Sequence, residues 1–253
     1  MMPMKDNHTA AAADGTACGT LYLIPCPIAD DTAPAEVMPE CKMRIIDSLD
    51  YFIVENLRSA RRFLSKAGIS RAIDSLTFAE LNEHTVRREE VERLAEPLLH
   101  GRSAGVISEA GVPAVADPGQ AIVDVCHRRG IRVVPLVGPS SIILAVMASG
   151  LNGQSFAING YLPVKEPERT RAIKRLEARS AAEHQSQAFI ETPYRNVKLA
   201  EQLLRVCAPE TRLCIACDIT SASERIVTAS IGEWRRRGLP DIARHPAVFV
   251  IGR

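Results

Sequence analysis

Residues 101–119 combine the residue types that can bind a ligand at the end of a strand. The small and apolar run over residues 103–108 predicts a buried strand of a parallel sheet. The loop after it contains Glu109 together with prolines, which restrict the backbone, and glycines, which let a ligand approach it closely. Because ligands of open α/β sheets bind beyond the carboxyl ends of the strands, this loop is a candidate binding edge. An ordinary connection is the competing interpretation, since most such loops bind nothing.

Two predicted helices begin next to polar residues that can cap the helix or bind a ligand. Asp117 is a typical N-cap residue and Pro118 suits the first helical position, so we expect a helix from there to Gly130. Residues 138–141 (Gly-Pro-Ser-Ser) open an apolar helix over residues 142–149. The free N–H groups of a helix start suit a carboxylate or phosphate, and a plain serine N-cap is the alternative.

Two further groups follow a strand predicted over residues 73–81. Glu83 and His84 come after its end and precede a helix predicted from residue 86, so they are expected near the same crevice. Histidine titrates near neutral pH and can transfer protons, which makes His84 a candidate. A lone histidine beside a loop is more often an exposed polar residue.

A basic helix is predicted over residues 57–67, after a strand at residues 51–54. Its cations are Arg58, Arg61, Arg62 and Lys66. They can contact phosphates, or they can form a solvated face, which is the commoner role of such a run without interleaved aromatic residues.

The alternation of strands and helices predicts an α/β protein with two domains. Residues 160–167 contain two prolines and a change to charged composition, which indicates a hinge. We therefore expect a flexible tail over residues 1–18, an N-terminal α/β domain over 19–160 and a C-terminal α/β domain over 161–253.

Composition limits the partners and the compartment. The 253 residues carry a net charge of +1, so any RNA binding must be local rather than driven by a global field. No segment has the pattern of a signal peptide or the length of a membrane span, which predicts a cytoplasmic protein. Seven irregularly spaced cysteines do not form a disulfide pattern. Cys214 and Cys217 form one CxxC without a second pair, so buried thiols are expected rather than a metal site.

Six motifs occur in order between residues 19 and 195: GTLYLIPCPI, VENLRSARRFL, ISEAGVPAVADPG, VVPLVGPSSIILAVMASGL, NGYLP and FIETPYR. Together they resemble the tetrapyrrole-methylase superfamily of S-adenosylmethionine-dependent methyltransferases, and most of all its branch that methylates a cytidine ribose 2′-hydroxyl of small-subunit ribosomal RNA. The resemblance implies two α/β domains with a cofactor cleft between them and a homodimer.

Residue by residue, the resemblance implies cofactor contacts from both predicted domains. These are Pro25, Ser108, Glu109, Ala110, Gly111, Val112, Pro113, Gly138, Ser140, Ser141, Thr192 and Pro193. The implied RNA contacts are Arg58, Arg61, Arg62 and Asn82. A ribose hydroxyl is a poor nucleophile, so Glu109, Glu83 and His84 are candidate bases, and the sequence does not choose among them.

The chain departs from the RNA branch at strand ends that face the substrate. The usual G-N-L-x-D-I-T is replaced at residues 28–33, E-D-T-R becomes Glu55-Asn56-Leu57-Arg58, and S-D-A-G-T-P becomes the sequence of residues 108–113. Two alternatives to RNA methylation therefore stay open. One is methylation of a tetrapyrrole or a protein, and the other is a cofactor-binding protein without catalysis.

Overall fold

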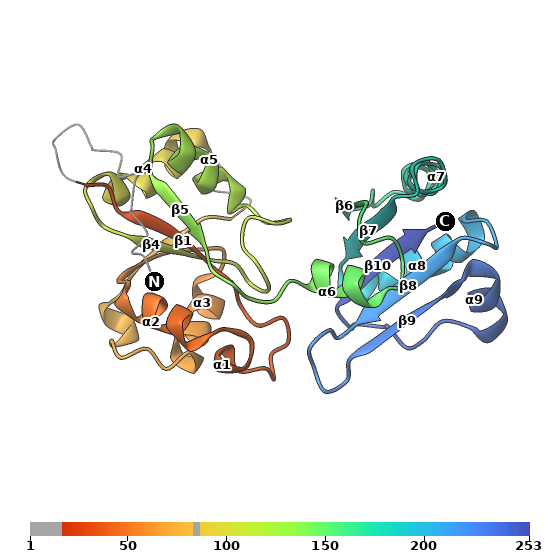
Figure 1. The fold of residues 1–253 in the computed structure, drawn as a ribbon, viewed down its shortest axis with the longest axis horizontal. Helices are drawn as coiled ribbons and strands as arrows, with labels where there is room; N and C mark the ends of the chain where they lie inside the picture. Colours follow the sequence, from red (N-terminus) through yellow and green to blue (C-terminus); the bar gives the residue numbers. More distant parts are fainter. Residues whose placement is uncertain (1–16, 83–86) are drawn as a thin grey trace, which may run out of the picture. The chain divides into compact units, whose positions relative to one another are not determined.

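The computed structural model describes residues 17–82 and 87–253. The chain divides into two compact units, residues 1–139 and 140–253. Each unit is a sheet packed against helices, which confirms the predicted α/β class (Figure 1). The predicted tail lies outside the described residues, except for its last two positions.

The first unit is a parallel sheet covered on both faces. Its strands are β1 (Thr20–Ile24), β2 (Tyr51–Val54), β3 (Thr77–Glu80), β4 (Ala104–Ile107) and β5 (Arg132–Pro135), in the order β3-β2-β4-β1-β5. Its helices are α1 (Pro34–Val37), α2 (Glu40–Ser48), α3 (Leu57–Lys66), α4 (Arg88–Leu99) and α5 (Gln120–Arg128), with the 3-10 turn η1 (Ile73–Ser75). Because the strands are parallel, all their carboxyl ends lie at one edge.

Two apolar clusters hold this sheet. Figure 1 shows α4 and α5 on one face of the sheet and α3 on the other. Val91 and Leu98 of α4 share one apolar cluster with Ile122 of α5, and Phe63 and Leu64 of α3 belong to the other. β4 lies in the middle of the sheet and all four of its residues are buried, as its apolar sequence predicts.

The second unit is a mixed sheet with its own core. Its strands are β6 (Phe156–Tyr161), β7 (Ser186–Glu191), β8 (Arg212–Cys217), β9 (Arg225–Ser230) and β10 (Ala247–Gly252), in the order β6-β7-β10-β8-β9. Its helices are α6 (Ser141–Ala148), α7 (Glu166–Glu183), α8 (Asn196–Val206) and α9 (Ile231–Arg237), with the 3-10 turn η2 (Pro193–Arg195). Phe189 and Phe249 stack in the core against side chains of α7, α8 and α9.

The predicted hinge over residues 160–167 starts within β6 and ends within α7, with residues 162–165 between the two elements. Residues 156–161 pair with β7, so the boundary expected at residue 160 lies inside the second unit, which begins at Ser140. Gly160 has φ +59 and stands where the register shifts between Ile158 and Tyr161. Glycine is common both at bulges of edge strands and in linkers between domains. The sequence pattern around Gly160 therefore does not distinguish a bulge from a hinge.

Candidate functional site

The loops after β1 and β4 are joined by their backbones. The N–H of Cys26 donates to the carbonyl of Gly111 at 2.8 Å, and the N–H of Gly111 donates back to Cys26 at 3.1 Å. Gly111 has φ +71, a conformation that glycine adopts without the steric penalty of a Cβ. The predicted cofactor loop is therefore held beside the end of β1.

The loop after β5 packs against the same place. A Cβ on Gly138 would lie 2.3 Å from the Cβ of Pro25, so only glycine lets these two loops touch. A Cβ on Gly111 would lie 3.7 Å from the carbonyl oxygen of Pro139, which places the third loop beside the other two. The fold thus brings together Pro25, Gly111 and Gly138, three predicted cofactor contacts far apart in sequence.

Asp117 organises the loop after β4 and does not cap the helix. Its carboxylate accepts hydrogen bonds from the N–H groups of Ala114 at 2.9 Å and Gly119 at 2.7 Å, and α5 begins only at Gln120. The helix expectation was wrong at this point because the same carboxylate is used by a tight turn of the loop. Burial raises the pKa of Asp117, and the two N–H donors oppose the rise.

Ser108 starts this loop in a buried position. Its hydroxyl lies 3.5 Å from the carbonyl of Ala110, and it lines a small recess together with Glu55 and Asp117. The Glu55 carboxylate accepts the N–H of Glu109 at 3.1 Å. This bond ties the end of β2 to the β4 loop and fixes the backbone that carries the candidate base Glu109.

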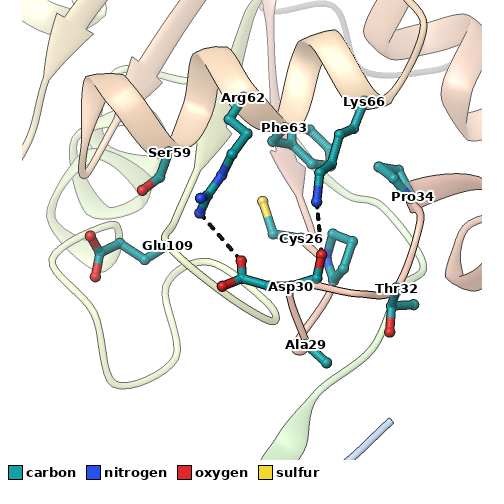
Figure 2. A pocket seen from close by; sticks show the side chains of 11 residues that line it. Cys26, Ala29, Asp30, Thr32, Pro34, Ser59, Arg62, Phe63, Lys66 and Glu109 are labelled. Atoms are coloured by element: carbon teal, nitrogen blue, oxygen red, sulfur yellow. Dashed lines mark hydrogen bonds and ion pairs between the residues drawn. The ribbon is translucent and has the colours of Figure 1, made fainter. Parts of the chain in front are cut away.

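Glu109 borders a second, larger pocket of about 50 Å³ (Figure 2). Arg62 and Lys66 of α3 line its other side, and Cys26 lies in its wall. Burial raises the pKa of the Cys26 thiol to about 12, so Cys26 itself adds no charge to the pocket. A candidate base and two cations of the predicted basic helix therefore surround one pocket.

Asp30, in the loop after β1, contacts both cations of this pocket, Arg62 and Lys66. Arg62 Nη2 lies 3.3 Å from the carboxylate of Asp30, and Lys66 Nζ donates to the Asp30 carbonyl at 2.7 Å (Figure 2). Sequence reasoning missed Asp30 and Ser59 as pocket residues. Asp30 and Arg62 are 32 positions apart, and no local spacing links them.

The other cations of α3 differ in their surroundings. Arg61 forms an ion pair with Asp74, and its guanidinium lies over the ring of Phe78. Arg58 is exposed and has no ion pair within residues 17–82 and 87–253. The predicted basic face is therefore partly neutralised by neighbouring carboxylates, and Arg58 keeps an unpaired charge.

The remaining predicted cofactor contacts belong to the second unit. Ser140 is the N-cap of α6, since its hydroxyl accepts the N–H of Ile143 at 3.4 Å, and Ser141 is the first residue of the helix. Thr192 and Pro193 follow β7, where the Thr192 N–H donates to the buried Glu191 carboxylate at 2.7 Å. The same carboxylate binds Arg195 at 2.6 Å and raises the pKa of that guanidinium.

The third strand end is described only in part. Asn82 is half-buried and follows β3, as predicted for an RNA contact. The candidate bases Glu83 and His84 lie outside the described residues.

Comparison with known proteins defines the class. Residues 37–234 match the family described as Tetrapyrrole (Corrin/Porphyrin) Methylases, and the chain belongs to this family. It is an S-adenosylmethionine-dependent methyltransferase, as the resemblance predicted. Within the described residues, no helix is long and apolar enough to span a bilayer.

Curated proteins and solved structures are similar to this chain over most of its length. The chain is 31% identical to "Ribosomal RNA small subunit methyltransferase I" of Vibrio cholerae over 91% of this chain and 74% of that protein. It is 32% identical to the protein of the same name from Escherichia coli O157:H7, with the same coverage. A solved uroporphyrin-III C-methyl transferase from Thermus thermophilus, complexed with S-adenyl homocysteine, has a TM-score of 0.55 at 19% identity and covers 93% of this chain and 98% of its own. That likeness confirms the fold.

We predict that Asp117→Ala loosens the cofactor loop. It leaves the N–H groups of Ala114 and Gly119 without their acceptor, so the free energy of unfolding should fall by about 1–3 kcal/mol and S-adenosylmethionine should bind more weakly. Asp117→Asn keeps one acceptor oxygen, so it should lose less of the free energy of unfolding and less of the cofactor affinity. Urea titration and calorimetry of the three proteins measure this, and an Ala variant equal to the wild type would disprove the role.

Proposed function

We propose that this methyltransferase modifies a ribose 2′-hydroxyl of ribosomal RNA. The observation that carries the proposal is the pocket in which Glu109 lies with Arg62 and Lys66, because it combines a proton acceptor with cations suited to a phosphate. The names of the bacterial relatives, which are ribosomal RNA methyltransferases, support the same substrate class.

The residues around the joined loops fit the cofactor that the family implies. Pro25, residues 108–113 and Gly138 form a compact wall in which a glycine at 138 is required by packing, whereas a Cβ on Gly111 would make only an ordinary contact with the Pro139 carbonyl oxygen at 3.7 Å. We propose these residues, with Ser140, Ser141, Thr192 and Pro193, as its contacts. When bound, S-adenosylmethionine supplies an activated methyl group.

The protein then has to orient the acceptor and remove its proton. We propose Glu109 as the base, because its side chain is exposed at the pocket while its backbone is held by Glu55. A carboxylate within reach of the acceptor hydroxyl would accept its proton as the methyl group passes from the cofactor sulfur to the hydroxyl oxygen. Glu83 and His84 remain candidates for the same role.

RNA recruitment is proposed to start at Arg58. Its charge has no local partner in the described residues, whereas Arg62 and Lys66 have to leave Asp30 before they contact a phosphate. Asn82 at the end of β3 is proposed as a further RNA contact. Phosphate contacts release counterions, so binding should weaken as salt rises even though the net charge is only +1.

The direct test is transfer of a labelled methyl group from S-adenosylmethionine to purified ribosomal RNA and small ribosomal subunits. A 2′-O-methyl group blocks alkaline cleavage at its own position, so labelled dinucleotides should survive alkali. Glu109→Gln should lower the rate at saturating S-adenosylmethionine by roughly two to four orders of magnitude. Glu89→Gln on α4, an exposed carboxylate outside the pocket, is the matched control.

Other outcomes point to other functions. Label in protein or in a tetrapyrrole would replace the RNA proposal by the alternative acceptors. Cofactor binding without any labelled product would indicate a non-catalytic binding protein. Full activity of Glu109→Gln on RNA would move the base to Glu83 or His84.

Two cations of α3 allow a matched comparison. Arg58→Gln should weaken RNA binding several-fold and lower the salt slope by about one, because it removes an unpaired charge. Arg61→Gln should change RNA binding little, because Arg61 is paired with Asp74. Fluorescence titration across salt concentrations measures both, and equal effects of the two variants would contradict the assignment.

We also propose a homodimer that acts in the cytoplasm, where ribosomal RNA is modified. Ile158 and Tyr161 are exposed on β6, the edge strand of the second sheet, and an exposed edge with apolar side chains favours association. Sedimentation over a range of concentrations should detect a dimer that Ile158→Lys weakens. A monomer at every concentration would remove this proposal.

A further inference from the structure

Three potential metal ligands meet in the second unit, among the residues that the structure describes. They are Cys217 at the end of β8, the adjacent Asp218, and His245 shortly before β10. One ligand atom from each lies within 4.8 Å of the other two. Thiolate, carboxylate and imidazole are the ligand types of zinc sites in proteins.

The backbone explains how neighbouring residues share one site. Successive side chains of a strand face opposite sides, but Asp218 has φ +51, so the extended run ends there. The Asp218 N–H donates to the Pro246 carbonyl at 3.0 Å, which holds this turn against the segment that carries His245. Asn196 fixes that segment further, because its side-chain amide donates to the His245 carbonyl at 2.6 Å.

Two of the groups are inside the protein and one reaches the surface. Cys217 is 1% exposed, the Asp218 side chain 11% and the His245 side chain 42%. Asp218 Oδ2 lies 2.7 Å from His245 Nδ1 and also accepts a hydrogen bond from Ser223 Oγ at 3.1 Å. The carboxylate is thus oriented, while the imidazole side is open to solvent and gives an ion access.

We propose that Cys217, Asp218 and His245 bind a divalent cation of the zinc class, with water as the fourth ligand. Typical zinc–ligand bonds are about 2.3 Å long to sulfur and about 2.0–2.2 Å long to nitrogen and oxygen. In a tetrahedral site, these bond lengths place the ligand atoms roughly 3.3–3.8 Å from one another. The three atoms already lie within 4.8 Å, and the contact between Asp218 and His245 has to open from 2.7 Å.

Charge balance favours the dication. On binding, the cation would displace the thiol proton of Cys217 to solvent. Thiolate and carboxylate together then neutralise the two positive charges of the ion, which lowers the cost of placing charge in a largely buried site.

The CxxC motif is not the site. Cys214 and Cys217 are three positions apart on β8, so their side chains face opposite sides of the sheet. The sequence expectation of buried thiols holds for both cysteines. For Cys217 the relevant partner is His245, which a search for paired CxxC spacings does not reach.

The competing explanation is an ordinary ion pair between Asp218 and His245, with Cys217 as a core residue. It predicts no thiolate–metal bond. The metal proposal does not depend on the proposed RNA methylation, because it concerns residues outside the Glu109 pocket and has its own spectroscopic readout.

The experiment uses the full chain without a polyhistidine tag, after removal of metals with a chelator. Titration with Co²⁺ should produce a near-ultraviolet thiolate-to-metal charge-transfer band that saturates at one ion per chain, and Zn²⁺ should abolish the band and raise the melting temperature. Cys217→Ala should lose the band and weaken Zn²⁺ binding by more than about tenfold, since even outer partners of metal ligands have effects of that size.

Two further variants keep the test decisive. Cys214→Ala, a buried cysteine of the same strand, should keep the band and the affinity. His245→Gln, at the more exposed ligand, should weaken binding without affecting the fold, and it serves if Cys217→Ala does not fold. A wild-type protein without the band, a band that survives in Cys217→Ala, or an unchanged Co²⁺ affinity in His245→Gln would overturn the proposal.

Discussion

Two backbone hydrogen bonds between Cys26 and Gly111 hold the loops after β1 and β4 together, and the rest of the binding edge is arranged around them. With these loops fixed, Gly138 can pack on Pro25, and Glu55 can hold the N–H of Glu109. Each of these contacts joins a different strand end. Because the strands are parallel, their ends form one edge, and the edge becomes a rigid surface.

Ion pairs with neighbouring carboxylates determine how much positive charge α3 presents to a ligand. Carboxylates from η1 and from the loop after β1 neutralise Arg61 and Arg62. These pairs are exposed, so each contributes little to stability and is open to exchange with a phosphate. The nearly neutral chain therefore keeps a local positive charge at Arg58, next to Ser59 of the pocket lining, among the residues that the structure describes.

Several features were predictable because they depend on neighbouring residues. The apolar run of β4, the asparagine cap of α3 and the serine cap of α6 follow from short-range spacing and hydrogen bonding. Six ordered motifs identified the family, which the match over residues 37–234 confirmed. Where one local pattern serves two structures, prediction failed: Asp117 closes a loop turn instead of capping a helix, and Gly160 permits a bulge instead of a hinge.

The sequence by itself determined the family, the α/β class, the order of most elements and the loops that carry candidate residues. Tertiary structure alone decided which of these residues meet. Asp30 lies against Arg62 across 32 positions, and Asp218 lies against His245 across 27. Such contacts depend on the order of the strands in the sheet and on the direction of the backbone where each strand ends, as at Asp218, whose φ is positive. A periodic pattern along the chain contains neither kind of information.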